Sequence, residues 1–446
     1  MNNFTSEITF SIRDEYKRKN IAQKIIQLLD SDIGISPLVI DGGWGTGKTE
    51  FAHKLKNMLN ENQDVPIAVY IDAFKEDHTD APILTLLAAI ISLIPEDQTS
   101  RLIEKAIPAL KFGLKTSLKA GTAWLLKQST DDLADEFQDA IRKTNDAIID
   151  KTVGSMLQDH IDAEKNIQSL KNALEEVTTE RPLTIIIDEL DRCKPSFAVS
   201  IIENIKHVFD SVGVNFILIT NTVQLYASIN HMYGISVNSR QYLDKFIKFS
   251  ITLPTHYKHL GNSLVNASEQ HWRNISKNDN VLLNANAGSE KMISSLINQG
   301  GLSLREVETF ARHIKIFQVL TNNSINSNAL SEYTFLEIFG IFLYSFNKKS
   351  AESVVDKTIN LDTIGDALNI QNFNYTLNRE RSTIQLVLYG LIRESNCNST
   401  RFPRPTPEQK QQWDTFLTSH YQNTNYEANG FSLVVASAIN TLMLSL

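Results

Sequence analysis

Cysteine, glycine and proline are all scarce in this sequence. Its two cysteines, Cys193 and Cys397, exclude a framework of several disulfides and a cysteine-rich zinc site. Glycine (18) and proline (11) fall below their usual shares of about 7% and 5%, which excludes a low-complexity chain and favours long helices. The first residues lack the basic stretch and apolar run of a secretory signal. We therefore expect a cytoplasmic protein.

Positive charge is also in short supply, because 43 Lys and Arg face 51 Asp and Glu, for a net charge of −8. A protein that coats DNA or RNA over its whole surface normally carries the opposite excess, so the net charge disfavours that class. A local basic groove remains open. With 446 residues, 42% of them hydrophobic, the chain is long enough for two or three units with buried cores.

The sequence does contain short apolar runs that alternate with helical patterns. The runs are too short for helices and predict buried strands of a parallel sheet at 37–41, 67–71, 183–187, 215–220 and 246–253. Helices are predicted at 14–29, 48–60 and 198–209. Strand–helix–strand alternation of this kind is typical of an α/β fold.

Helical patterns fill the rest of the chain. We expect a helical lead-in over 1–36, an α/β core over 37–255 with a helical insertion at about 80–180, and a helical C-terminal domain over 256–446. Within that domain, Thr406-Pro-Glu-Gln409 has the residues of a capping box, which predicts the start of a helix.

A glycine-rich segment follows the first predicted strand and opens a helix: Gly42-Gly43-Trp44-Gly45-Thr46-Gly47-Lys48-Thr49. It fits the phosphate-loop pattern G-x-x-x-x-G-K-[ST]. Glycines let backbone N–H groups turn toward phosphate oxygens, and the helix N-terminus adds partial positive charge. Lys48 is expected to reach the β- and γ-phosphates of ATP, and the Thr49 hydroxyl to coordinate Mg²⁺. The sequence thus predicts a P-loop fold that binds nucleotide.

Two adjacent acids, Asp188 and Glu189, end the third predicted strand. The carboxyl ends of parallel strands form the edge at which such sheets bind ligands. Asp188 is expected to hold Mg²⁺, directly or through water, and Glu189 to orient and deprotonate an attacking water. Asp191 and Arg192 follow in the same turn, where a structural ion pair between them is an equal alternative to a role in the site.

With these motifs, the sequence resembles the KAP family of P-loop NTPases. The resemblance rests on residues 42–49, Ile187-Asp-Glu-Leu-Asp-Arg-Cys-Lys-Pro195, Tyr242-Leu-Asp-Lys-Phe246 and Asp72-Ala-Phe-Lys75, and it spans about residues 10–315. It implies the fold of the additional-strand catalytic-glutamate ATPases, with another strand between the two motif strands and a helical insertion before the acidic one.

The resemblance also implies roles for residues outside these motifs. Asn221, at the end of the fourth strand, would sense the γ-phosphate, and Arg305 would be the arginine that follows the core domain. Either residue is alternatively an ordinary loop residue or helix-surface charge. Candidates for a cation that acts on a neighbouring subunit are Arg192, Arg240 and Lys245.

Many family members carry transmembrane helices in the insertion. Here 81–95 is apolar but short of the roughly 20 residues needed to span a bilayer. Segment 107–126 is long enough, yet Lys111, Lys115 and Lys119 fall on one stripe, which predicts an amphipathic helix of a bundle or, alternatively, of a membrane surface. The short apolar end, 431–446, predicts a core or interface helix. We expect no transmembrane segment.

These features favour an ATP-hydrolysing switch or assembly protein. ATP would bridge the core and the helical domain through Lys48 and Arg305, and hydrolysis through Glu189 would release that state. The expected partner is a further copy of the chain or another protein, and the resemblance implies a bacterial defence or regulatory system. The alternative is a nucleic-acid-dependent motor or loader with the lysines of 105–127 in its channel. A scaffold that holds nucleotide without hydrolysis is a third hypothesis.

Overall fold

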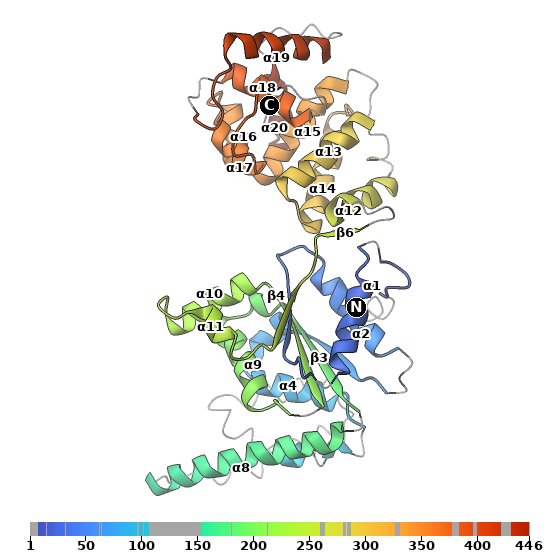
Figure 1. Cartoon of the computed structure of the whole chain (residues 1–446), viewed down its shortest axis with the longest axis vertical. Helices are drawn as coiled ribbons and strands as arrows, with labels where there is room; N and C mark the ends of the chain where they lie inside the picture. The colour runs from blue at the N-terminus through green and yellow to red at the C-terminus, as the bar shows by residue number, and fades with distance from the viewer. Residues whose placement is uncertain are drawn as a thin grey trace. The chain divides into compact units, whose positions relative to one another are not determined.

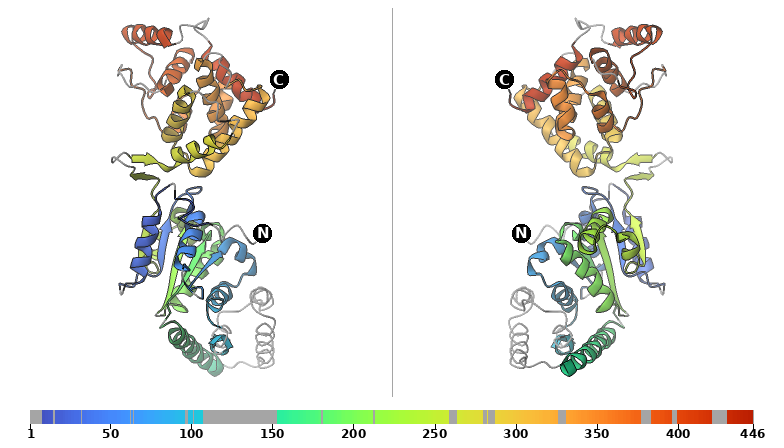
Figure 2. Two further views of the ribbon diagram at one scale, coloured as in Figure 1. Left: turned by 90° about the vertical axis from the view of Figure 1, so that its right-hand side faces the viewer. Right: turned by 90° about the vertical axis from the view of Figure 1, so that its left-hand side faces the viewer.

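The chain divides into two compact units, Met1–Leu253 and Pro254–Leu446 (Figures 1 and 2). The computed structural model describes residues 8–14, 16–31, 33–61, 63, 65–95, 98–100, 102–106, 153–179, 181–211, 213–258, 264–279, 282, 287–325, 331–376, 383–395, 399–420 and 430–445.

A five-stranded parallel sheet forms the centre of the first unit. Its strands are β1 (Leu38–Asp41), β2 (Ala68–Asp72), β3 (Leu183–Asp188), β4 (Val214–Thr220) and β5 (Phe249–Thr252), in the order β2-β3-β4-β1-β5. Every neighbouring pair is parallel, and the register places Asp72 beside Asp188 and Asp41 beside Thr220. The α/β prediction is confirmed, and β4 is the strand between the two motif strands that the resemblance implied.

Alternating side chains give this sheet two apolar faces. Leu38 and Ile40 pack toward α1 (Lys19–Leu29) and α2 (Lys48–Leu59), together with the even-numbered Ile186 of β3. The opposite face, which includes Val39 and Ile185, is covered by α4 (Pro82–Ile91), α9 (Pro195–His207) and α10 (Thr222–Tyr233). The last two are labelled to the left of the sheet in Figure 1. The long α8 (Val153–Thr178) contributes Leu170 and Leu174 to that second core. Burial on both faces explains why these strands are nearly all apolar.

Two predicted elements are shorter than expected. The helix predicted to begin at residue 14 begins at Lys19, because Lys17 has a positive φ of 53° and Asp14 accepts hydrogen bonds from the backbone N–H groups of Arg18 and Lys19. The strand predicted over 246–253 covers only β5, because the short helix α11 (Ser239–Leu243) and the turn after it precede it. β5 pairs only with β1 at the sheet edge, so the prediction of a buried strand there is wrong.

The predicted helical insertion is described only at its ends. α4 and α8 bear out helical structure there, next to the short α3 (Ala73–Glu76) and the 3₁₀ turn η1 (Asp77–Thr79). Residues 107–152 lie outside the described part of the chain. The lysine stripe of Lys111, Lys115 and Lys119 and nearly all of the proposed channel segment therefore stay predictions.

The second unit is helical after a short antiparallel ribbon of β6 (His256–Lys258) and β7 (Leu264–Asn266). Its helices are α12 (Ala267–Lys277), α13 (Ala287–Gly300), α14 (Leu304–Leu320), α15 (Ser331–Phe346), α16 (Lys348–Val355), α17 (Leu361–Ala367), α18 (Thr383–Glu394), α19 (Pro407–His420) and α20 (Phe431–Leu442). The apolar α20 packs in the core, as predicted, with Val435 and Ile439 fully buried. The capping box at α19 is also confirmed, because Thr406 and Gln409 exchange side-chain to backbone hydrogen bonds.

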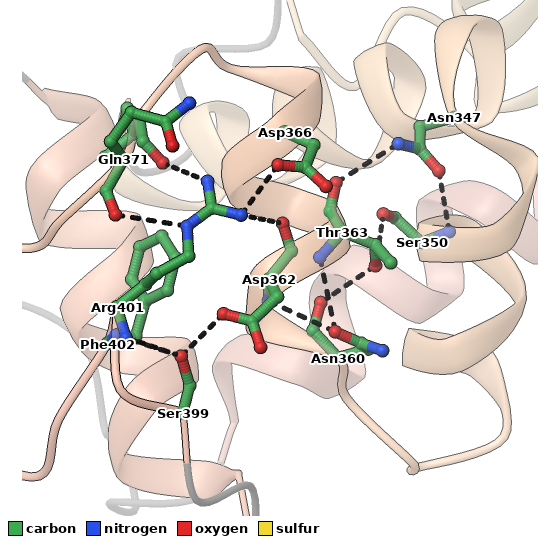
Figure 3. Close-up of polar contacts among 11 residues, drawn as sticks. Asn347, Ser350, Asn360, Asp362, Thr363, Asp366, Gln371, Ser399, Arg401 and Phe402 are labelled. Atoms are coloured by element: carbon green, nitrogen blue, oxygen red, sulfur yellow. Dashed lines mark hydrogen bonds and ion pairs between the residues drawn. The ribbon is translucent and has the colours of Figure 1, made fainter.

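Polar contacts of one arginine connect loops of this unit. Figure 3 shows the Arg401 guanidinium beside the end of α17, where it donates to the Asp366 carboxylate at 2.7 Å and to the Ile370 and Gln371 carbonyls at 2.7 and 3.0 Å. These carbonyls belong to the turn after the helix, where backbone acceptors lack helical partners. Arg401 therefore has a structural role.

Candidate functional site

The glycine-rich segment forms a loop between β1 and α2. Gly45 and Gly47 have φ of 76° and 78°, a left-handed conformation that glycine adopts without steric cost. Gly47 is also the N-cap of α2, so the first amides of that helix open onto the loop. A loop of this kind at a helix N-terminus suits an anion.

Lys48 lies against the start of this loop and is only 9% exposed. Its Nζ donates to the carbonyl oxygens of Gly42 at 2.6 Å and Gly43 at 3.0 Å. Burial lowers the pKa of the lysine, and the carboxylates of Asp191 and Asp188 act against that shift. The amine is thus placed inside an acidic edge of the sheet.

Asp188 ends β3 and is 1% exposed. Burial raises the pKa of this carboxyl, while hydrogen bonds from the Thr49 hydroxyl, the Glu189 backbone and the Tyr70 hydroxyl act in the other direction. Oδ1 accepts from the backbone N–H of Glu189 at 2.8 Å, and Oδ2 accepts from the Tyr70 hydroxyl at 3.1 Å. The carboxylate is therefore held in one orientation between the loop helix and β2.

Glu189 begins the turn after β3 in a left-handed conformation, with φ of 60°. Its Oε1 lies 3.5 Å from Thr49 Oγ1, and its other oxygen forms an ion pair with the Arg192 guanidinium. Burial and the neighbouring Asp188 charge raise the pKa of Glu189, and Arg192 lowers it. The structure thus brings Thr49 of the loop together with both acids of the distant strand.

Asp191 does not pair with Arg192, so that alternative is wrong. Both residues lie in the 3₁₀ turn η2 (Leu190–Arg192), but Arg192 points to Glu189. The Asp191 carboxylate instead accepts from the Trp44 indole Nε1 at 2.7 Å and from the Thr220 hydroxyl at 3.2 Å. It connects the loop to the end of β4.

Asn221 follows β4 at the same edge of the sheet. Its side-chain oxygen accepts from the Val223 backbone N–H at 3.2 Å and so caps α10, while its own backbone N–H donates to Asp191 at 3.1 Å. Among the described residues, none accepts a hydrogen bond from its Nδ2 group. The capping bond orients the amide, and its NH₂ group can serve a ligand.

Sequence reasoning missed Tyr70. Its ring stacks against His53 of α2, with centroids 4.1 Å apart, and its hydroxyl reaches Asp188. Burial and the Asp188 charge raise the pKa of Tyr70 far above its ordinary value, so the hydroxyl stays a donor. The one available signal was a tyrosine within an otherwise aliphatic strand.

The remaining candidates lie on other elements of the chain. Arg305 is the second residue of α14 in the second unit, next to a capping box formed by Ser303 and Glu306. Arg240 lies in α11, and Lys245 lies over the Tyr242 ring at 5.9 Å from its centroid. Their roles stay predictions.

The described residues of the chain lack two features. They contain no helix with the length and apolar character needed to cross a bilayer. They also contain no group of three or more His, Cys, Asp or Glu side chains arranged around a metal.

Comparison with known proteins assigns the chain. No curated protein matches it. The model of the KAP family P-loop domain matches residues 18–321, about two thirds of the sequence. This match covers the sheet, the phosphate loop and the acidic strand end described above. The chain therefore belongs to the KAP family of P-loop NTPases, whose members bind nucleotides and hydrolyse nucleoside triphosphates.

Proposed function

We propose that the protein binds ATP with Mg²⁺ and hydrolyses it to switch between two states that assemble differently. The observation that carries this proposal is the meeting of the phosphate loop with a buried acid pair: Thr49 Oγ1 lies 3.5 Å from Glu189 Oε1 and also hydrogen bonds to Asp188. A loop that only held phosphate would not require the second acid.

The triphosphate would lie along the loop. Backbone N–H groups of residues 43–48 and the N-terminus of α2 would bind its β-phosphate oxygens. Lys48 now donates to two neutral carbonyl groups, and phosphate oxygens are stronger acceptors for an ammonium group. The lysine would then exchange one or both of these bonds for a bond to the nucleotide.

The residues beside the loop suit a hard cation. The Thr49 hydroxyl and the Asp188 carboxylate offer only oxygen atoms, the ligands that Mg²⁺ prefers. When bound, Mg²⁺ neutralises charge on the phosphate oxygens. Tyr70, which donates to Asp188, would hold that carboxylate toward the ligand side.

Glu189 is the proposed base. The water oxygen would attack the γ-phosphorus while the bond to the β–γ bridging oxygen breaks, and a water proton would pass to the Glu189 carboxylate. A raised pKa suits a base that must accept a proton near neutral pH. Because Arg192 now holds the carboxylate, we propose that this ion pair loosens when the water is in place.

The switch would depend on contacts that only ATP provides. Asn221, at the end of β4, would bind the γ-phosphate through its NH₂ group. The resemblance implies that Arg305 would act on the same phosphate. Loss of the γ-phosphate removes both contacts, which gives ATP and ADP different affinities for the two states. The assembly partner would be another copy of the chain or another protein, and the defence setting implied by the resemblance stays a prediction.

A trapping experiment tests this proposal. Glu189→Gln should bind ATP without turnover and accumulate a larger assembly or partner complex, whereas Lys48→Ala should bind little ATP and form none. Glu61→Gln, at an exposed glutamate outside the site, is the matched control and should behave as wild type. Equal recovery of the assembly from the Lys48 and Glu189 variants would overturn the switch.

A further inference from the structure

One carboxylate connects three neighbouring strand ends of the sheet. Asp191 lies in η2, directly after β3, and Oδ2 accepts from Trp44 Nε1 in the loop after β1 at 2.7 Å. Oδ1 accepts from Thr220 Oγ1 at 3.2 Å and from the Asn221 backbone N–H at 3.1 Å, both at the end of β4. β3, β4 and β1 are consecutive in the sheet, so these bonds cross it at the ligand edge.

The loop side of this contact depends on a single bond. Trp44 is 51% exposed, so core packing does not fix its ring. It stands between Gly43 and Gly45, and Gly45 has a positive φ. Glycine neighbours leave the backbone free to move. The indole N–H, which can only donate, therefore fixes the tip of the loop through Asp191.

The strand side is rigid by contrast. Thr220 is fully buried at the end of β4, and Asn221 caps α10. Both oxygens of Asp191 thus accept hydrogen bonds from residues at the ends of neighbouring strands. Asp191 is suited to hold other groups in place.

We propose that Asp191 is a positioning residue that fixes the phosphate loop, through Trp44, relative to the end of β4 that carries Asn221. This inference rests on the proposed function, in which Lys48 and Asn221 bind the same triphosphate. Displacement of a contributing group by about 1 Å can reduce a rate by about 100-fold, so a loosened loop should slow hydrolysis more than it weakens binding.

The test is the steady-state hydrolysis of ATP together with the affinity for a fluorescent ATP analogue. Trp44→Phe removes the indole donor and keeps an aromatic ring, and Asp191→Ala removes the acceptor. Each should lower kcat by about tenfold or more while Kd changes by less than about threefold. The double variant should be no slower than the slower single variant, since both remove one connection.

Three further variants guard against a merely structural effect. Thr220→Val should also lower kcat, and Thr220→Ser, which keeps the hydroxyl, should restore it. Asp210→Ala is the matched control: this aspartate forms an ion pair with Lys206 at 2.9 Å and precedes β4 at its other end. Its kcat should equal that of wild type.

The two proposals can fail separately. If wild type hydrolyses ATP and both Trp44→Phe and Asp191→Ala keep its kcat, the inference is overturned while the function stands. Multiplicative losses in the double variant would also overturn it, because the residues would then act independently. If the wild-type chain does not turn over ATP, both proposals are overturned.

Discussion

Thr49 Oγ1 lies 3.5 Å from Glu189 Oε1, although 140 positions separate the two residues in the chain. The first opens the helix after the phosphate loop, and the second follows the acidic strand. β4 separates their strands in the sheet, so the contact forms at the shared edge, where the carboxyl ends of parallel strands meet.

Tyr70→Phe should raise the Mg²⁺ concentration needed for half-maximal ATP hydrolysis. The variant loses the hydroxyl that orients Asp188, and loss of such a supporting bond typically costs about 10-fold or more in metal affinity. Titration of the hydrolysis rate with Mg²⁺ measures this half-maximal concentration. Tyr375→Phe, which loses a hydroxyl bond to the Pro403 carbonyl in the other unit, should leave the titration unchanged. Identical titrations for the two variants would contradict the assigned role of Tyr70.

Arg192→Gln should move the acidic limb of the pH–rate profile to higher pH. The Arg192 charge lowers the pKa of Glu189, so its removal favours the protonated carboxyl. A base works only when deprotonated, and activity would therefore be lost at a higher pH as the pH falls. The profile of kcat against pH tests this, with Arg273→Gln, which breaks a similar ion pair with Glu269, as the control. A limb that stays in place would argue against Glu189 as the base.

Glu337→Gln should stabilise the second unit above neutral pH. Burial raises the pKa of Glu337 in α15 to about 7, so the folded state binds a proton more tightly than the unfolded state does. Stability is therefore lost as pH rises from the ordinary glutamate pKa to about 7, at a cost of up to about 3 kcal/mol.

Urea unfolding at pH 5 and pH 8 measures this difference. The gain of Glu337→Gln over wild type should be larger at pH 8 and should shrink at pH 5. The exposed Glu352, replaced by Gln, should show no such pH dependence. A gain that is equal at both pH values would contradict the burial of a protonated Glu337.

Gly340→Ala should destabilise the second unit by about 2 kcal/mol. A Cβ at this position of α15 would lie 2.7 Å from the Val435 carbonyl oxygen of α20, so the two helices would have to separate. Thermal unfolding measures the loss, with Ser437→Ala on the exposed side of α20 as the control. A melting temperature equal to that of wild type would show that the close helix contact is dispensable.

The sequence predicts the sheet well because each central strand is a short aliphatic run. In residues 183–187 and 215–220 the only polar side chains are Thr184, Asn215 and Thr220. All the others are apolar and favour a buried strand. The strand predicted over 246–253 is shorter, because α11 and the turn after it occupy the preceding residues. It is also more exposed than predicted, because it lies at the sheet edge, and the local sequence does not reveal the strand order.

The site was predictable where the chemistry depends on local spacing. The phosphate loop and the acid pair are contiguous motifs, and their meeting follows from parallel strands. The partners of Asp191 and Asp188 were not predictable, since Trp44 lies 147 positions from Asp191 and Tyr70 lies 118 positions from Asp188. Hydrogen bonds between residues so far apart in the chain depend on the order of the strands in the sheet. No periodic pattern in the sequence predicts them.

The most direct measurement of the central claim is calorimetric titration of ATP with Mg²⁺ into the wild-type chain and the Lys48→Ala variant. We expect one nucleotide per wild-type chain and an affinity about 100-fold weaker in the variant, in line with the loss of a charged hydrogen bond. No uptake by wild type, or equal affinity in both proteins, would contradict a triphosphate held beside Lys48.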